Sequence, residues 1–246
     1  MNRTMIPVVA VFAFMLVQAG ALAREKKVLM LGNSYSSGTA HWIKTMFTKE
    51  SAGYKFTVLS PGGKDLQYHA NAEATLAKLK SEKWDVLIMQ GQSLQTAATP
   101  AHPAQFQQQV TALVELAREH NVPRIMLFQT WGRRDGHKQF KDAYPDFQTM
   151  HRRVSEQYGI AGEKNKVEVV PVGTAFAVIH KEHDELFRGL YKKDGSHPSP
   201  QAGYMAACVF YGAITGNSPL QVKWDDKLPG ETAAILKKAA AGALTM

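Results

Sequence analysis

The amino-acid sequence predicts a three-layer α/β/α sandwich around a five-stranded parallel sheet. Short apolar runs alternate with longer segments of helical spacing, and each run ends at a small or polar turn-forming group. No linker rich in Pro, Gly or Ser and no internal repeat interrupts residues 24–246. Alternating strands and helices of this kind pair in parallel through right-handed crossovers, with helices on both faces of the sheet. We therefore expect a single α/β domain over residues 24–246.

Residues 1–23 have the features of a secretory signal peptide. An apolar stretch follows Arg3 and ends in an A-x-A cleavage signature at residues 21–23. An uncleaved anchor is the alternative, but Pro7 breaks the apolar stretch, which is short for a membrane-spanning helix. We expect cleavage at this signature, export to the periplasm or the cell exterior, and no stable membrane insertion of the mature chain.

The formal net charge of +8 favours acidic surroundings. The basic residues are dispersed and no nucleic-acid-binding motif occurs, which argues against nucleic acid as a partner and favours an anionic polysaccharide. Cys208 is the only cysteine, so no disulfide and no thiolate metal site is expected. It lies in an apolar helical stretch, where we expect a small core residue.

The first strand brings a serine to the edge of the sheet. Residues 28–31 form an apolar run suited to a strand buried on both faces, and Gly32-Asn33-Ser34 follow directly. Helical spacing resumes at residue 39, which places Ser34 in a strand-to-helix turn. Ligands of open α/β sheets bind beyond the carboxyl ends of strands, where helix amides point toward negative charge. Ser34 is therefore a candidate nucleophile, with a helix-capping role as the alternative.

Four further strands complete the pattern. They are expected at residues 55–60, 84–89, 124–129 and 167–171, with helices at residues 39–49, 69–79, 104–120 and 142–158. The second strand leads into a glycine turn at residues 61–63, and the third into Gln90-Gly91-Gln92-Ser93. No G-x-G-x-x-G follows the first strand and no P-loop motif occurs, so we do not expect a dinucleotide-binding version of the fold.

A second chemical motif lies near the C-terminus, where Asp194 and His197 form a D-x-x-H turn. A serine nucleophile needs a base that takes its proton, and the imidazole needs an acidic partner that fixes its tautomer. Three residues of separation in a turn let the two side chains face each other. Either residue alone has an ordinary structural explanation in a turn. Together with Ser34 they form a candidate Ser-His-Asp triad.

These motifs resemble those of the SGNH/GDSL hydrolase superfamily, in the same order and over nearly the whole mature chain. The resemblance implies a flavodoxin-like fold, Ser34 as the nucleophile, and Asp194 and His197 as the acid and the base. It implies no cofactor and no metal. It also implies an oxyanion hole that includes the backbone amides of Ser34 and Gly63, with Gly62 as the alternative register.

One motif departs from the superfamily pattern. The superfamily carries Gly-x-Asn-Asp where this chain has Gln90-Gly91-Gln92-Ser93, and Gln92 falls on the asparagine. A glutamine amide can donate the same hydrogen bond to an oxyanion. The stretch, together with Trp131 after a threonine, resembles a branch of the superfamily in which glutamine replaces this asparagine. We therefore expect Gln92 to be the third oxyanion donor.

The loop after the fourth strand offers two candidate substrate contacts. The ring of Trp131 can form a stacking wall for a sugar, with packing at the sheet edge as the alternative. Arg133 can contact an anionic substituent, with a solvated surface position as the alternative. His180 and His183 have the spacing of metal ligands on one helix face, but their charged neighbours are typical of an exposed helix.

The combined features predict an exported, cofactor-free serine esterase that hydrolyses O-acyl esters, above all acetyl esters of a carbohydrate. The substrate is either a small molecule or a polysaccharide. In the expected reaction Ser34 attacks the acyl carbon while His197 takes its proton and later protonates the alcohol. A noncatalytic carbohydrate-binding domain on the same scaffold is the alternative, which the glutamine at position 92 keeps open.

Overall fold

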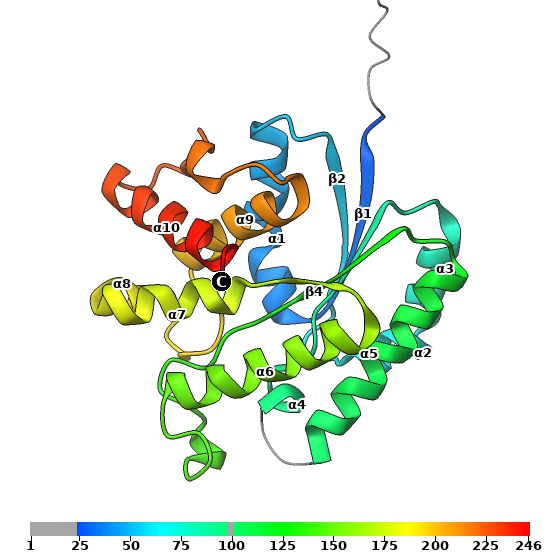
Figure 1. The fold of residues 1–246 in the computed structure, drawn as a ribbon, viewed down its shortest axis with the longest axis horizontal. Helices are drawn as coiled ribbons and strands as arrows, with labels where there is room; N and C mark the ends of the chain where they lie inside the picture. Colours follow the sequence, from blue (N-terminus) through cyan, green and yellow to red (C-terminus); the bar gives the residue numbers. More distant parts are fainter. Residues whose placement is uncertain (1–23, 98–100) are drawn as a thin grey trace, which may run out of the picture.

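The structure, a computed structural model, describes residues 24–97 and 101–246, and the predicted signal peptide lies outside the described residues. Figure 1 shows a central sheet with helices on both faces. The strands are β1 Lys26–Leu31, β2 Tyr54–Leu59, β3 Val86–Met89, β4 Arg124–Phe128 and β5 Glu168–Val170. The α-helices are α1 Ser34–Lys49, α2 Leu66–Asn71, α3 Glu73–Ser81, α4 Ser93–Ala97, α5 Ala101–Glu119, α6 Phe147–Asn165, α7 Val172–Glu182, α8 Asp184–Gly189, α9 Pro200–Thr215 and α10 Gly230–Ala243, and the 3₁₀ turns are η1 Lys138–Phe140 and η2 Pro219–Gln221.

The five strands are all parallel and lie in the order β2-β1-β3-β4-β5. The chain moves from β1 to β2 in one direction and then crosses back to β3, so the strand order reverses between β1 and β3. The carboxyl ends of these two strands meet at this switch point, which is where open α/β sheets bind their ligands. The predicted fold class is confirmed.

The sheet separates two apolar cores. In β1, Val28 and Met30 face one core, whereas Leu29 and Leu31 face the other, and none of the four side chains is exposed. Helices α1, α7, α9 and α10 cover the first core, and α5 and most of α6 cover the second. A parallel strand covered on both faces needs an apolar residue at every position, which explains the unbroken apolar runs.

Some helix boundaries differ from the expected ones because local polar groups set them. The expected helix over residues 69–79 divides into α2 and α3 at Ala72, whose ψ of 122° is extended. Helix α6 begins after Asp146, whose carboxylate accepts a hydrogen bond from the Thr149 amide at 2.8 Å. Such a cap stops the helix from extending toward the residues before it.

The structure also bears on membrane-spanning helices, on Cys208 and on metal-binding groups. Within the described ranges, no helix combines the length and apolar character needed to span a bilayer. Cys208 is buried in α9, and burial raises the pKa of its thiol to about 12. The part of the chain that the structure describes holds no group of three or more His, Cys, Asp or Glu placed to bind a metal ion. His180 instead packs against the ring of Phe187, with 4.5 Å between the ring centroids.

Candidate active site

Ser34 is the first residue of α1 and follows the turn that ends β1. Asn33 caps the helix, because its Oδ1 accepts a hydrogen bond from the Tyr35 amide at 3.1 Å. The interpretation of Ser34 as the helix cap is therefore wrong, and its hydroxyl is available for other contacts. Gly32 lets two side chains approach the backbone closely, since a Cβ at this position would lie 2.1 Å from Oγ of Ser36 and 2.7 Å from Oε1 of Gln90.

The hydroxyl of Ser34 faces His197. Ser34 Oγ lies 2.9 Å from His197 Nε2, and His197 Nδ1 lies 2.6 Å from Oδ2 of Asp194. When Nδ1–H donates to the carboxylate, Nε2 is the acceptor for the serine hydroxyl. The structure thus brings the three residues of two distant motifs into one hydrogen-bonded chain. A nucleophile, a base and an orienting acid at these distances have the geometry of an activated serine.

The turn that carries Asp194 fixes its carboxylate and keeps it charged. Oδ1 accepts hydrogen bonds from the amides of Ser196 and His197, both at 2.9 Å. Burial alone would raise the pKa of Asp194, but these amides and the His197 side chain lower it to about 2. The carboxylate is therefore ionised at neutral pH, where it can stabilise a positive charge on the imidazole.

Two buried side chains support the serine turn, a role that the sequence pattern predicts for neither. Gln90 accepts a hydrogen bond from the Asn33 amide on Oε1 at 3.0 Å, while its Nε2 donates to the Gly91 carbonyl. His69 donates from Nε2 to the Gly32 carbonyl at 2.8 Å, and burial lowers the pKa of this imidazole. Gln90 had a sequence signal, because a glutamine directly after a buried strand must find partners. We see no comparable signal for His69.

The expected oxyanion donors line the same small cavity as Ser34. This catalytic cavity has a volume of about 190 Å³ and is lined by Asn33, Ser34, Tyr35, Gly63, Gln92, Ser93, Arg133, Ser196 and His197. Gly63 is part of the lining and Gly62 is not, which favours the Gly63 register. Gly63 has a φ of +69°, a conformation that glycine adopts without strain. The amide of Ser34 stands in the first turn of α1, where it has no partner within the helix.

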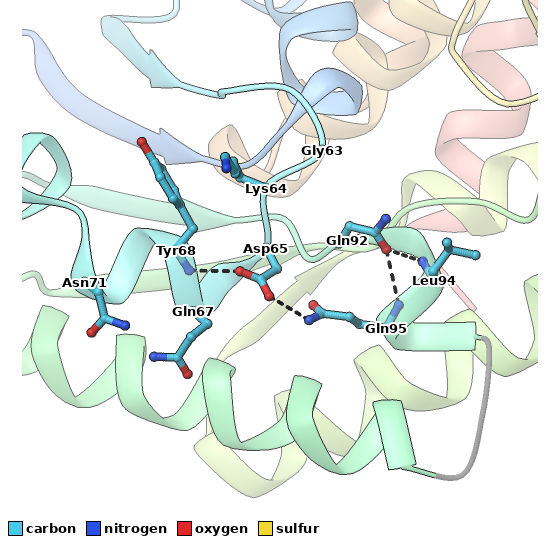
Figure 2. A pocket seen from close by; sticks show the side chains of 9 residues that line it. All are labelled: Gly63, Lys64, Asp65, Gln67, Tyr68, Asn71, Gln92, Leu94 and Gln95. Carbon is cyan, nitrogen blue, oxygen red and sulfur yellow. Dashed lines mark hydrogen bonds between the residues drawn. The ribbon is translucent and has the colours of Figure 1, made fainter.

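Gln92 presents its side-chain amide in a defined orientation. Figure 2 shows Oε1 turned toward the start of α4, where it accepts hydrogen bonds from the amides of Leu94 at 2.5 Å and Gln95 at 3.3 Å. The side chain therefore caps a helix as well as lining the catalytic cavity. Because the oxygen is held in this way, Nε2 is the end of the amide that can donate to a ligand.

Trp131 lies behind the site rather than in it, so its assignment as a sugar-stacking residue is wrong. The indole is fully buried and stacks against the rings of Tyr35 and Phe176, with centroid distances of 4.8 and 4.4 Å. Its Nε1 donates to the Ser196 carbonyl at 3.0 Å, and the hydroxyl groups of Tyr35 and Ser196 lie 2.6 Å apart. This stack holds the turn of the acid and the base against α1.

Arg133 lines the catalytic cavity, and its role as a substrate contact stays a prediction. The side chain is half-buried, and its Nε is buried without a hydrogen-bond partner among the residues that the structure describes. Burial raises the pKa of Tyr35, and the nearby Arg133 guanidinium opposes that rise. The neighbouring Arg134, in contrast, pairs with Asp135 at 2.7 Å. Arg133 thus brings a positive charge to the cavity wall.

The fold and the site together define a class of protein: a flavodoxin-like α/β domain with the side-chain arrangement of a serine hydrolase at its switch point. No protein-family model matches the sequence, and no curated protein matches it. Solved structures do match. A DUF4886 family protein from Bacteroides uniformis is 19% identical with a TM-score of 0.73, over 89% of this chain and 95% of that one.

Two further structures carry functional descriptions. A protein from Slackia heliotrinireducens, provisionally described as an SGNH hydrolase, is 26% identical with a TM-score of 0.65, over 79% of this chain and 100% of that one. Axe2, an acetylxylan esterase from Geobacillus stearothermophilus, is 17% identical with a TM-score of 0.59, over 78% and 94% of the two chains. The resemblance to the SGNH/GDSL hydrolase superfamily is confirmed. The branch with glutamine in place of asparagine stays a prediction.

Proposed function

We propose that this protein is an exported serine esterase that removes O-acetyl groups from a carbohydrate through Ser34, His197 and Asp194. The observation that carries the proposal is the hydrogen-bonded chain of these three side chains at a cavity that also holds the expected oxyanion donors. Similarity to SGNH hydrolases and to an acetylxylan esterase supports ester hydrolysis.

The proposed reaction uses groups of this chain alone. Ser34 Oγ attacks the acyl carbon while His197 Nε2 takes the hydroxyl proton, and Asp194 stabilises the imidazolium. The carbonyl oxygen gains negative charge and accepts hydrogen bonds from donors beside Ser34. His197 then gives its proton to the leaving alcohol. A water molecule, activated by the same imidazole, releases the acid and restores the serine.

The cavities around Ser34 support a short acyl group and a polar alcohol. The catalytic cavity of about 190 Å³ is smaller than the roughly 300–1,000 Å³ of a typical ligand pocket. A cleft of about 420 Å³ adjoins it at Arg133, and most of the side chains that line this cleft are polar or charged. Such a surface suits a polyol ester better than a lipid ester.

A series of 4-nitrophenyl esters tests the proposal directly. We expect hydrolysis of the acetate, weaker hydrolysis of the butyrate and little hydrolysis of the octanoate, together with acetate release from acetylated oligosaccharides. Ser34→Ala is the control and should abolish every activity. Preference for the octanoate would overturn the acetyl assignment. Binding of oligosaccharides without hydrolysis of any ester would favour the noncatalytic alternative.

Export can be tested on the same protein. If residues 1–23 are a signal peptide, secreted material should begin at Arg24 when its N-terminus is sequenced. An N-terminus at Met1 on membrane-bound material would favour the anchor instead.

A further inference from the structure

The two clefts beside the catalytic cavity lie on chemically different sides of it. The cleft in Figure 2 meets the cavity at Gly63 and Gln92, which are the expected oxyanion donors. A second cleft, of about 420 Å³, meets the cavity at Arg133 and is also lined by Asp194. In the proposed reaction the leaving oxygen must reach His197, which is hydrogen-bonded to Asp194. The alcohol therefore leaves on the side of Arg133.

The charged groups of this second cleft leave Arg133 without a carboxylate partner. Asp135 is paired with Arg134, and Asp194 is occupied by His197 and two backbone amides. Lys138 adds a second positive charge to the lining. Arg133 forms no ion pair with any of the residues that the structure describes. Its guanidinium lies near the Tyr35 hydroxyl, which is a neutral group.

His137 completes the titratable groups of the cleft. Its imidazole is buried, and burial followed by the charge of Arg133 lowers its pKa. A neutral imidazole does not offset the positive charge of the arginine. A half-buried guanidinium with no counter-charge loses hydration energy that nothing in the free protein offsets. A bound carboxylate or phosphate would offset that loss through charge-assisted hydrogen bonds.

On the basis of the proposed esterase function, we propose that the alcohol part of the substrate is an acidic saccharide and that Arg133 binds its carboxylate. A guanidinium forms paired hydrogen bonds with a carboxylate, so the contact would orient the sugar as well as attract it. The net charge of +8 agrees with an acidic substrate, because it raises the local concentration of anions.

The test compares acidic and neutral esters on matched variants. The probes are acetylated oligogalacturonides, acetylated xylo-oligosaccharides and 4-nitrophenyl acetate. We expect the wild type to prefer the acidic oligomers, and Arg133→Gln to lower kcat/KM for them by about tenfold or more, mainly through KM. The neutral substrates lack the carboxylate and should lose less, so that the ratio of kcat/KM for acidic over neutral substrates falls by about fivefold or more. For the acidic oligomers, kcat/KM of Arg133→Lys should lie between the values of the wild type and Arg133→Gln, because lysine keeps the charge and loses the paired hydrogen bonds.

Arg134→Gln is the matched control, since this adjacent arginine is already paired with Asp135. It should leave the preference for acidic oligomers unchanged. Equal kcat/KM values of the wild type for acidic and neutral oligomers, or equal effects of the two variants, would overturn the inference. A phosphorylated acetyl-sugar serves as a further arm, and a preference for it over the galacturonides would assign Arg133 to a phosphate instead.

A binding measurement separates this inference from the proposed function. Calorimetric titration of Ser34→Ala with the acidic oligomer should show binding that the added Arg133→Gln change weakens about tenfold. If the wild type hydrolyses no ester yet this binding is found, the esterase proposal fails and the anion site stands. If 4-nitrophenyl acetate is hydrolysed and no acidic oligomer binds, the anion site fails alone. Thermal unfolding of each variant checks that it folds.

Discussion

Gln92 caps α4 and is the expected oxyanion donor, and a pair of substitutions can separate these two contributions. Its Oε1 caps α4 through the amides of Leu94 and Gln95, and its Nε2 is the expected donor to the oxyanion. Gln92→Ala removes both. Loss of a cap costs about 1 kcal/mol of stability, and loss of one oxyanion donor costs about 3–4 kcal/mol in the transition state. We therefore expect turnover to fall roughly a hundredfold to a thousandfold.

Gln92→Glu keeps the acceptor for the helix and loses the donor for the oxyanion. A carboxylate at the start of α4 accepts the same two amide hydrogen bonds and favours the helix N-terminus. At the cavity the same charge repels the developing oxyanion. This variant should therefore unfold at or above the wild-type temperature and still lose at least as much turnover as Gln92→Ala.

The assay measures kcat and KM for 4-nitrophenyl acetate together with thermal unfolding. Gln95→Ala is the control, because Gln95 lines the neighbouring cleft and donates to Asp65 at 2.8 Å rather than lining the catalytic cavity. It should retain near wild-type turnover. If Gln92→Glu retains wild-type turnover, Gln92 does not serve the oxyanion, and a large loss in Gln95→Ala would transfer that role to Gln95.

Three further predictions concern the rest of the site. Gly63→Ala should lower turnover roughly tenfold or more, because a φ of +69° is strained for alanine. Gly62→Ala should leave turnover near the wild-type value, and equal turnover of the two variants would refute the Gly63 register. Trp131→Ala should lower the free energy of unfolding by about 3–5 kcal/mol in urea titrations, as expected for a fully buried ring, and a change below about 1 kcal/mol would contradict its structural role. Asp194→Asn should lower turnover roughly a thousandfold or more. The pKa of Asp194 falls from 3.8 to about 2 on folding, so its negative charge stabilises the fold above about pH 4. The difference in unfolding free energy between the wild type and Asp194→Asn should therefore shrink as the pH falls toward 2. A difference that grows on acidification would contradict the pKa shift.

The sheet and the positions of Ser34, Asp194 and His197 could be predicted because each depends on a local pattern. Buried parallel strands require unbroken apolar runs, such as residues 28–31, and the carboxyl ends of parallel strands meet at one edge. Ser34 directly follows such a run, and the short spacing between Asp194 and His197 limits where the two side chains can lie. The contact between Ser34 and His197 can be placed only once the strand order is known.

The surroundings of the site depend on contacts that no local pattern records. Trp131 stands at a strand end, but its burial depends on Tyr35 and Phe176, which come from helices far along the chain. The Gln-Gly-Gln stretch identifies two amides without showing that Gln90 faces the serine turn and Gln92 faces the cavity. Helices α1, α2 and α5 start before the expected residues, since apolar spacing marks the part of a helix that meets the core and not its polar first turn.

Ser34 is the proposed nucleophile, and active-site labelling distinguishes it from the other serines of the chain. The purified protein is treated with a fluorophosphonate and digested, and the modified peptide is identified by mass spectrometry. We expect one adduct, on Ser34, that appears as esterase activity is lost and is absent when His197 is replaced by alanine. An adduct on Ser93, which lines the same cavity, or on Ser199, or full esterase activity in Ser34→Ala, would contradict this assignment.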